Sequence, residues 1–177
     1  TPSTLTHAGR AQVRIAGSIA ALWSLLALAS AILTLAVVLG IPASEAASPN
    51  IAGTYLWDLP ASRSFVYVAV IAILISATSQ ILVSLNSMAM LIALAVAGIA
   101  LPLLNSHSAS LGDHSLAITS SVAHGVAAAL WVGTLWHTAP FVTRGDTAAI
   151  RRFSLIASGA VAVLVVSGAA AAYVRLA

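Results

Sequence analysis

The chain has 177 residues, of which 60% are apolar and 6% charged, and it contains no cysteine. This composition excludes an ordinary soluble domain, and the lack of cysteine excludes disulfides, thiolate metal sites and thiol catalysis. All 7 basic residues are arginines, and the formal net charge is +3. Because the arginines flank apolar runs, we interpret them as topology signals and expect no nucleic-acid partner.

Apolar runs of spanning length recur along the chain. They predict an all-α, polytopic transmembrane helical bundle of about five spans in a lipid bilayer, because a membrane barrel would show short alternating segments instead. Residues 1–12 are polar and small and are predicted to form a cytoplasmic tail or linker, so the transmembrane domain is expected at 13–177. The expected helices are 13–40, 64–85, 88–104, 114–138 and 147–174.

Two of the expected helices carry small residues at every fourth position, which would let a neighbouring backbone come close. These residues are Ala16, Ala20 and Ser24 on the first helix and Ser121, Gly125, Ala129 and Gly133 on the fourth. Met88 and Met90 have the soft sulfur that copper prefers. Two positions apart on a helix they point in nearly opposite directions, so we interpret them as packing residues.

Three histidines are the candidate functional residues: His107, His114 and His124. If a helix starts near His114, then His124 lies about 15 Å further in, near the middle of a hydrocarbon layer about 30 Å thick. An imidazole at that depth loses hydration that lipid cannot replace, so it is a functional candidate. The alternative is a histidine that only hydrogen-bonds a neighbouring helix. His137 lies about 20 Å beyond His124 and is expected at the opposite interface.

The arginine distribution predicts the orientation. Placing the N-terminus and the 139–152 link in the cytoplasm puts most of the positive charge inside. The arginines inside are then Arg10, Arg14, Arg144, Arg151 and Arg152, against Arg63 and Arg175 outside. With this orientation in the cytoplasmic membrane, His107 and His114 lie at the outer face and His124 lies below them.

The segments HSLAITSSVAHGVAAALWVGTLW (114–136) and RRFSLIASGAVAVLVVSG (151–168) resemble the CopD family of copper-resistance membrane proteins. Members of that family carry a histidine at the end of one helix, a His-rich start to the next, a W-x-G-x-L turn and a basic R-F-S start to the following helix. These elements correspond here to His107, to His114 with His124, to 131–135 and to 152–154. The resemblance covers about the last eighty residues. It departs from the family at Ser106 and Thr134, where the family often has glycine.

The resemblance implies copper, delivered from an extracytoplasmic carrier. In actinobacterial relatives this domain is often joined to a cytochrome c oxidase assembly domain. The family pattern also continues past residue 177, so the chain is expected to be an incomplete unit.

The leading interpretation is therefore a copper-handling membrane protein that accepts the ion through His107, His114 and His124 and passes it into or across the membrane. Histidines without thiolate suit Cu(II), or Cu(I) at low coordination number. The three could form one site or act in succession. One alternative is a b-type haem or electron-transfer subunit with two axial histidines, and another is a non-catalytic accessory subunit of a respiratory complex. No catalytic motif is present, so we expect no enzyme.

Overall fold

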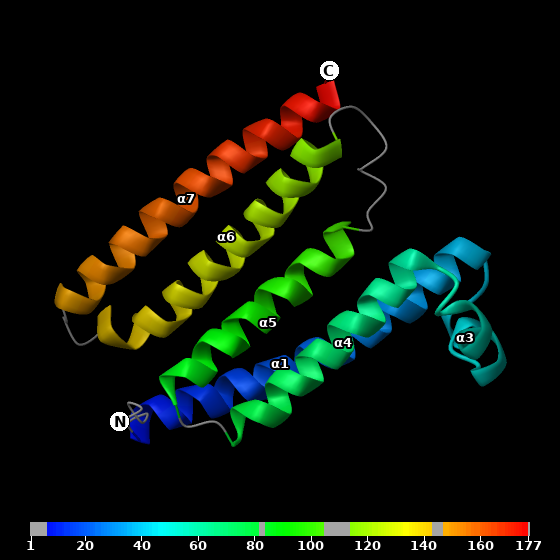
Figure 1. The fold of residues 1–177 in the computed structure, drawn as a ribbon, viewed down its shortest axis with the longest axis horizontal. Coiled ribbons are helices and arrows are strands. Elements are labelled where there is room, and N and C mark those ends of the chain that lie inside the picture. Colours follow the sequence, from blue (N-terminus) through cyan, green and yellow to red (C-terminus); the bar gives the residue numbers. More distant parts are fainter. Residues whose placement is uncertain (1–6, 82–83, 105–113, 143–146, 177) are drawn as a thin grey trace. The chain divides into compact units, whose positions relative to one another are not determined.

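The computed structural model describes residues 7–81, 84–104, 114–142 and 147–176. These residues form seven helices. They are α1 (His7–Leu39), α2 (Ala43–Ala46), α3 (Pro49–Tyr55), α4 (Pro60–Ser79), α5 (Leu85–Leu104), α6 (His114–Val142) and α7 (Thr147–Leu176) (Figure 1). Within this described part, 5 helices are long and apolar enough to cross a membrane. The predicted all-α fold with five spans is confirmed, and the chain is a multi-pass membrane protein.

The chain divides into two compact units, residues 1–105 and 106–177. Helix α1 begins at His7, so it includes the second half of the segment predicted as a tail. Helix α4 begins and ends several residues earlier than the helix predicted at 64–85. Pro60 explains the early start, because proline at the first helical position has the required φ and lacks only an N–H that would stay unpaired there.

The connection after α1 is more structured than its polar composition indicated. Gly40 has a φ of 67° and ends α1, and the Ile41 N–H donates to Ala36 O at 3.1 Å. This is the glycine-terminated helix end in which a left-handed residue lets the chain bond back across the last turn. A small apolar cluster follows in which Leu35, Ala36 and Ala46 are buried. Helices α2 and α3 therefore fold onto the end of α1.

In the first unit, α1 and α4 run antiparallel along their length (Figure 1). The buried face of α1 alternates steps of three and four residues and consists of Gly17, Ala20, Ser24, Ala27 and Ala31. The predicted four-residue stripe was therefore only partly correct, because Ala16 is exposed and Gly17 takes its place. A straight four-residue row drifts around a helix, whereas two helices in extended contact need the average spacing of 3.5.

Helix α5 contacts this pair through a glycine. A Cβ placed on Gly98 would lie 2.6 Å from Trp23 Cη2 of α1. The indole ring therefore packs directly on the backbone of α5, where only glycine leaves room. Gly98 is the one fully buried residue among the described side chains of α5, and the other described residues of this helix are half-buried or exposed.

The second unit is the antiparallel hairpin of α6 and α7 (Figure 1). Its buried face on α6 includes Ala117, Ser120 and Ala127, and α7 contributes Ala160 and Ser167. The stripe predicted at every fourth residue of α6 named no partner helix, and it does not coincide with the face that packs on α7. Two of its members, Ala129 and Gly133, are exposed, and a Cβ on Gly133 would meet nothing within 4 Å. The reason is again the 3.5-residue spacing of a long helix pair.

Candidate functional site around His124

His124 lies inside a membrane-spanning segment. The apolar span of α6 runs from Ser115 to Ala139, and His124 is nine residues into it. At 1.5 Å per residue this is about 14 Å along the helix, near the middle of a hydrocarbon core about 30 Å thick. The imidazole is not enclosed by the α6–α7 pair, because its side chain is exposed at the side of the hairpin.

One nitrogen of His124 is hydrogen-bonded to the neighbouring helix. Its Nδ1 lies 3.1 Å from Ser167 Oγ of α7, and Ser167 is buried. The Ser167 hydroxyl also lies 3.2 Å from Leu164 O, which accepts a hydrogen bond from it. When the hydroxyl proton is on Leu164 O, the imidazole donates from Nδ1 to the hydroxyl oxygen, and Nε2 carries the free lone pair.

Gly168 of α7 also lies beside the imidazole. A Cβ on Gly168 would lie 3.9 Å from His124 Cε1, which is ordinary van der Waals contact, so the ring would also fit beside an alanine. Among the described residues, His124 Nε2 has no hydrogen-bond partner, so this nitrogen is available to an added ligand.

The helix turn before His124 is polar. Ser120 and Ser121 both donate to Ala117 O, at 3.1 and 2.8 Å. These local bonds use their protons without a partner from another helix, which is how serine is accommodated in an apolar helix. Their oxygens keep free lone pairs one turn from His124. The turn before His124 thus carries two serine hydroxyls, of which Ser120 is buried and Ser121 half-buried.

The other two predicted ligands are not brought to His124 by the described part of the chain. His107 lies outside the described residues. His114 is the first residue of α6, and its side chain lies outside the described part. Among the described residues, no three His, Asp or Glu side chains gather as they would around a metal ion. The three-histidine site stays a prediction.

The remaining candidates are separate from His124. His137 is exposed in the last turns of α6, thirteen residues further along the helix. Trp131 is 37% exposed and two turns from His124. Met90 is 49% exposed, whereas Met88 lines a groove among α1, α4 and α5. The two methionine sulfurs do not converge on one site.

Sequence reasoning missed Ser167. Its only signal was a hydroxyl beside a glycine in the apolar run of α7, and nothing in the sequence indicated which residue of α6 it would meet.

The contact between His124 and Ser167 also bears on the haem alternative. Helix α7 contains no histidine, so the helix that packs on His124 supplies a hydroxyl instead of a second axial imidazole.

Comparison of this chain with protein-family models, with curated proteins and with solved structures finds no match.

Proposed function

We propose that this chain is a copper-handling membrane protein of the CopD type, which accepts the ion at the extracytoplasmic face and passes it into or across the membrane. The observation that supports this function best is the hydrogen bonding of the two ring nitrogens of His124. An imidazole inside a span has its Nδ1 hydrogen-bonded to Ser167, and its Nε2 has no hydrogen-bond partner among the described residues. A histidine with a purely structural role gains nothing from an exposed, unpaired acceptor at that depth, because lipid offers it no donor.

The chemistry of His124 fits copper as a transported ion. Metal-binding histidines commonly use one ring nitrogen for the metal and donate the other N–H to an oxygen, which sets the tautomer and holds the ring. Ser167 fills that second role here. With no cysteine in the chain, imidazole is the strongest donor available to Cu(I) or Cu(II) in this part of the membrane.

The geometry of α6 favours successive binding over one shared site. His114 and His124 belong to one uninterrupted helix, and ten residues place their backbones about 15 Å apart along its axis. Copper–nitrogen bonds are only about as long as the zinc–nitrogen bonds of 2.0–2.1 Å, so two imidazoles at this separation do not reach one ion. We propose that His107 and His114 receive copper at the rim and that His124 takes it next.

The direction of transfer follows from the proposed orientation in the cytoplasmic membrane, with the N-terminus in the cytoplasm. The rim histidines then face an extracytoplasmic copper carrier, and a cytochrome c oxidase assembly domain is a proposed partner. We propose no catalytic role.

The proposal is tested by copper stoichiometry and affinity of the purified chain and of His107→Ala, His114→Ala, His124→Ala and His137→Ala in matched membranes. We expect His124→Ala to weaken binding most, because no water replaces a lost ligand inside lipid. His137→Ala is the matched control on the same helix and should bind like the parent. If His124→Ala binds copper like the parent, or if only His137→Ala loses it, the proposal fails.

A pH titration gives an independent measurement. A proton and a copper ion compete for the same imidazole nitrogen, so copper affinity should fall as the pH drops through about 6.5, where imidazole ordinarily titrates. An affinity that is constant between pH 8 and pH 5 would contradict ligation by histidine.

An absorption spectrum taken on the same sample identifies the haem alternative, because haem would give an intense visible band.

A further inference from the structure

Helix α5 contains a proline that interrupts its hydrogen bonding. Pro102 lies inside the helix, and a proline has no backbone N–H. In a regular α-helix the carbonyl oxygen of Gly98 would accept a hydrogen bond from the N–H of residue 102. This carbonyl therefore lacks its helical donor, and the proline ring pushes it away from the helix axis.

A cavity of about 240 Å³ lies at this interruption, among α1, α4 and α5. Its wall on α5 consists of Gly98, Ile99 and Pro102, which are the two ends of the interrupted turn and the residue after its start. The carbonyl without its helical donor thus belongs to the turn that lines the cavity.

Ser30 of α1 brings a second hydrogen-bond acceptor to the same cavity. Its hydroxyl donates to Leu26 O at 2.9 Å, so its oxygen keeps lone pairs that can accept. The carbonyl of Gly98 can only accept. The two groups therefore require a ligand that donates hydrogen bonds.

The cavity lies within the apolar length of the helices. Gly98 is six residues before the end of the span Ser87–Leu104, and Ser30 is nine residues before the end of the span Gly9–Leu39. At 1.5 Å per residue these distances are about 9 and 14 Å. Lipid chains offer no hydrogen-bond donor at this depth, so a backbone carbonyl left unpaired there is costly.

The chemistry of the cavity selects among ligand classes. A cation would give up its hydration for two oxygens, because no carboxylate is among the lining residues. An anion would meet two acceptors, neither of which has a proton to donate to it. Water carries two donors, and a cavity with two or more polar partners and more than about 15 Å³ of room can hold it.

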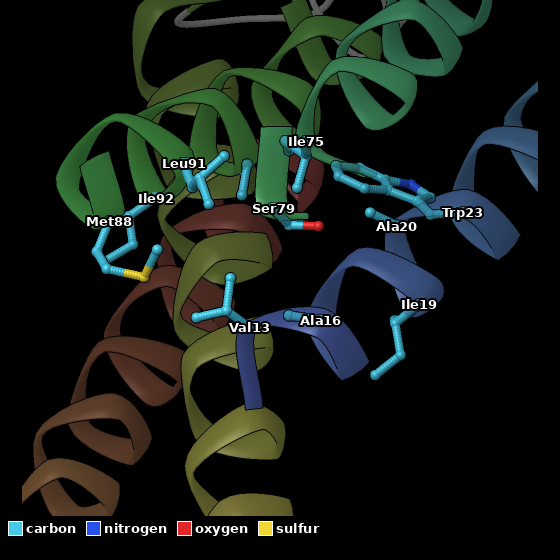
Figure 2. Close-up of a pocket in the computed structure, with 11 residues that line it drawn as sticks. Val13, Ala16, Ile19, Ala20, Trp23, Ile75, Ser79, Met88, Leu91 and Ile92 are labelled. Atoms are coloured by element: carbon cyan, nitrogen blue, oxygen red, sulfur yellow. The ribbon is translucent and has the colours of Figure 1, made fainter. Parts of the chain in front are cut away.

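A neighbouring groove provides the contrast. Trp23 lines the cavity and also a groove of about 310 Å³, which Figure 2 shows. The groove contacts α5 between Met88 and Ala95, where no proline interrupts the helix. Its lining is apolar except for Ser79 and the indole N–H of Trp23. We expect this groove to exclude water, although it is the larger of the two.

We propose that the cavity beside Pro102 binds water, which donates one hydrogen bond to the carbonyl of Gly98 and one to Ser30 Oγ. The water replaces the N–H that the proline lacks, so the helix stays hydrogen-bonded through its interruption. The site belongs to the first unit and does not depend on copper binding.

The test is water-edited solid-state NMR of the isotope-labelled full chain in lipid bilayers, which measures how fast magnetisation from water reaches each residue. We expect faster transfer to Gly98 than to Ala95, which lines the apolar groove. Pro102→Ala restores an N–H donor to the Gly98 carbonyl, so the fast transfer to Gly98 should be lost and fall to the rate of Ala95.

A pair of serine variants tests the second acceptor. Ser30→Ala should slow the transfer to Gly98, because the water loses one of its two partners. Ser18→Ala is the matched control and should leave the transfer unchanged, since Ser18 is an exposed serine of α1 that also donates to the carbonyl four residues before it. Resonances elsewhere in the chain that keep their positions verify that each variant is folded.

Three results would overturn the proposal. Transfer to Gly98 as slow as to Ala95 in the parent would mean that the cavity is dry, and magnetisation that reaches Gly98 from lipid chains in place of water would mean that lipid fills it. Fast transfer that persists in Pro102→Ala, or an equal loss in both serine variants, would mean that the carbonyl and Ser30 do not hold the water.

Discussion

At the scale of single residues, the availability of His124 depends on one hydroxyl of another helix. Ser167 Oγ lies 3.1 Å from His124 Nδ1 and 3.2 Å from Leu164 O, so it accepts from Nδ1 when its own proton goes to Leu164 O. If Ser167 lost this role, the imidazole could rotate or change tautomer, and Nε2 would no longer be held as the free acceptor. Ser167 is thus a positioning residue for the proposed copper ligand.

We therefore expect Ser167→Ala to lower copper affinity by about tenfold, the lower end of the effect seen when a partner of a metal-binding histidine is removed. The ¹⁵N chemical shifts of the His124 ring should change at the same time, because they report which nitrogen is protonated. Ser158→Ala on the exposed surface of α7 is the control. Parental affinity together with an unchanged tautomer in Ser167→Ala would show that the serine does not position the ring.

Two buried serines of α4 provide a second prediction. Ser62 is 0% exposed, and its hydroxyl has no hydrogen-bond partner within the described residues, whereas Ser64 is 1% exposed and donates to Pro60 O at 2.7 Å. An unpaired buried hydroxyl costs about 1–3 kcal/mol. We expect Ser62→Ala to raise the free energy of unfolding and Ser64→Ala to lower it, measured by denaturant unfolding in detergent. A loss of stability in Ser62→Ala as large as in Ser64→Ala would mean that the Ser62 hydroxyl is paired.

At the scale of elements, small residues determine which helices come close. On α1, Gly17, Ala20 and Ser24 are buried, and the side chain of Ser79 of α4 packs on Gly17, while Gly98 of α5 accepts the ring of Trp23. In lipid the hydrophobic effect does not drive helices together, so dispersion contacts at such close approaches carry much of the association. The bulk of each interface side chain therefore matters more than its hydropathy.

Gly98→Ala tests this explanation. Its new Cβ would lie 2.6 Å from Trp23 Cη2, so the ring or the helix must shift, and we expect a loss of about 1–3 kcal/mol in stability. Gly159→Ala is the matched control on α7, because a Cβ there meets nothing within 4 Å. This control should be neutral or more stable by up to about 1 kcal/mol, from helix propensity. Thermal unfolding of both variants in one detergent gives the comparison, and equal melting temperatures would contradict a close Trp23–Gly98 contact.

At the scale of the whole molecule, the five candidate spans among the described residues predict that the two ends of the chain lie on opposite sides of the membrane. The arginine distribution then predicts which side holds each link. A reporter inserted at Ser48, between α2 and α3, should be extracytoplasmic, and one inserted at Thr147, at the start of α7, should be cytoplasmic. Fusions that are active only when external or only when cytoplasmic measure both positions. The reverse pattern would place His114 at the cytoplasmic face and contradict copper uptake from outside.

The class of protein, the number of candidate spans and the position of His124 along its helix could be derived from the sequence. Lipid cannot hydrogen-bond the backbone, so apolar runs of sufficient length must be helices. Along a helix, depth is the residue count multiplied by a constant rise. For this reason the predicted start of α6 at His114 agrees with the structure, and its end differs by only a few residues.

The faces of the helices and their partners were decided only by the tertiary structure. A span that is apolar all round has no polar face to mark its lipid side. The sequence therefore did not show that Gly17 and not Ala16 is buried on α1, or that the face of α6 with Gly133 is exposed while another face packs on α7. The bond between His124 and Ser167 joins residues 43 positions apart, and their meeting depends on the register of two antiparallel helices. That register results from the packing of small side chains, which local sequence patterns do not encode.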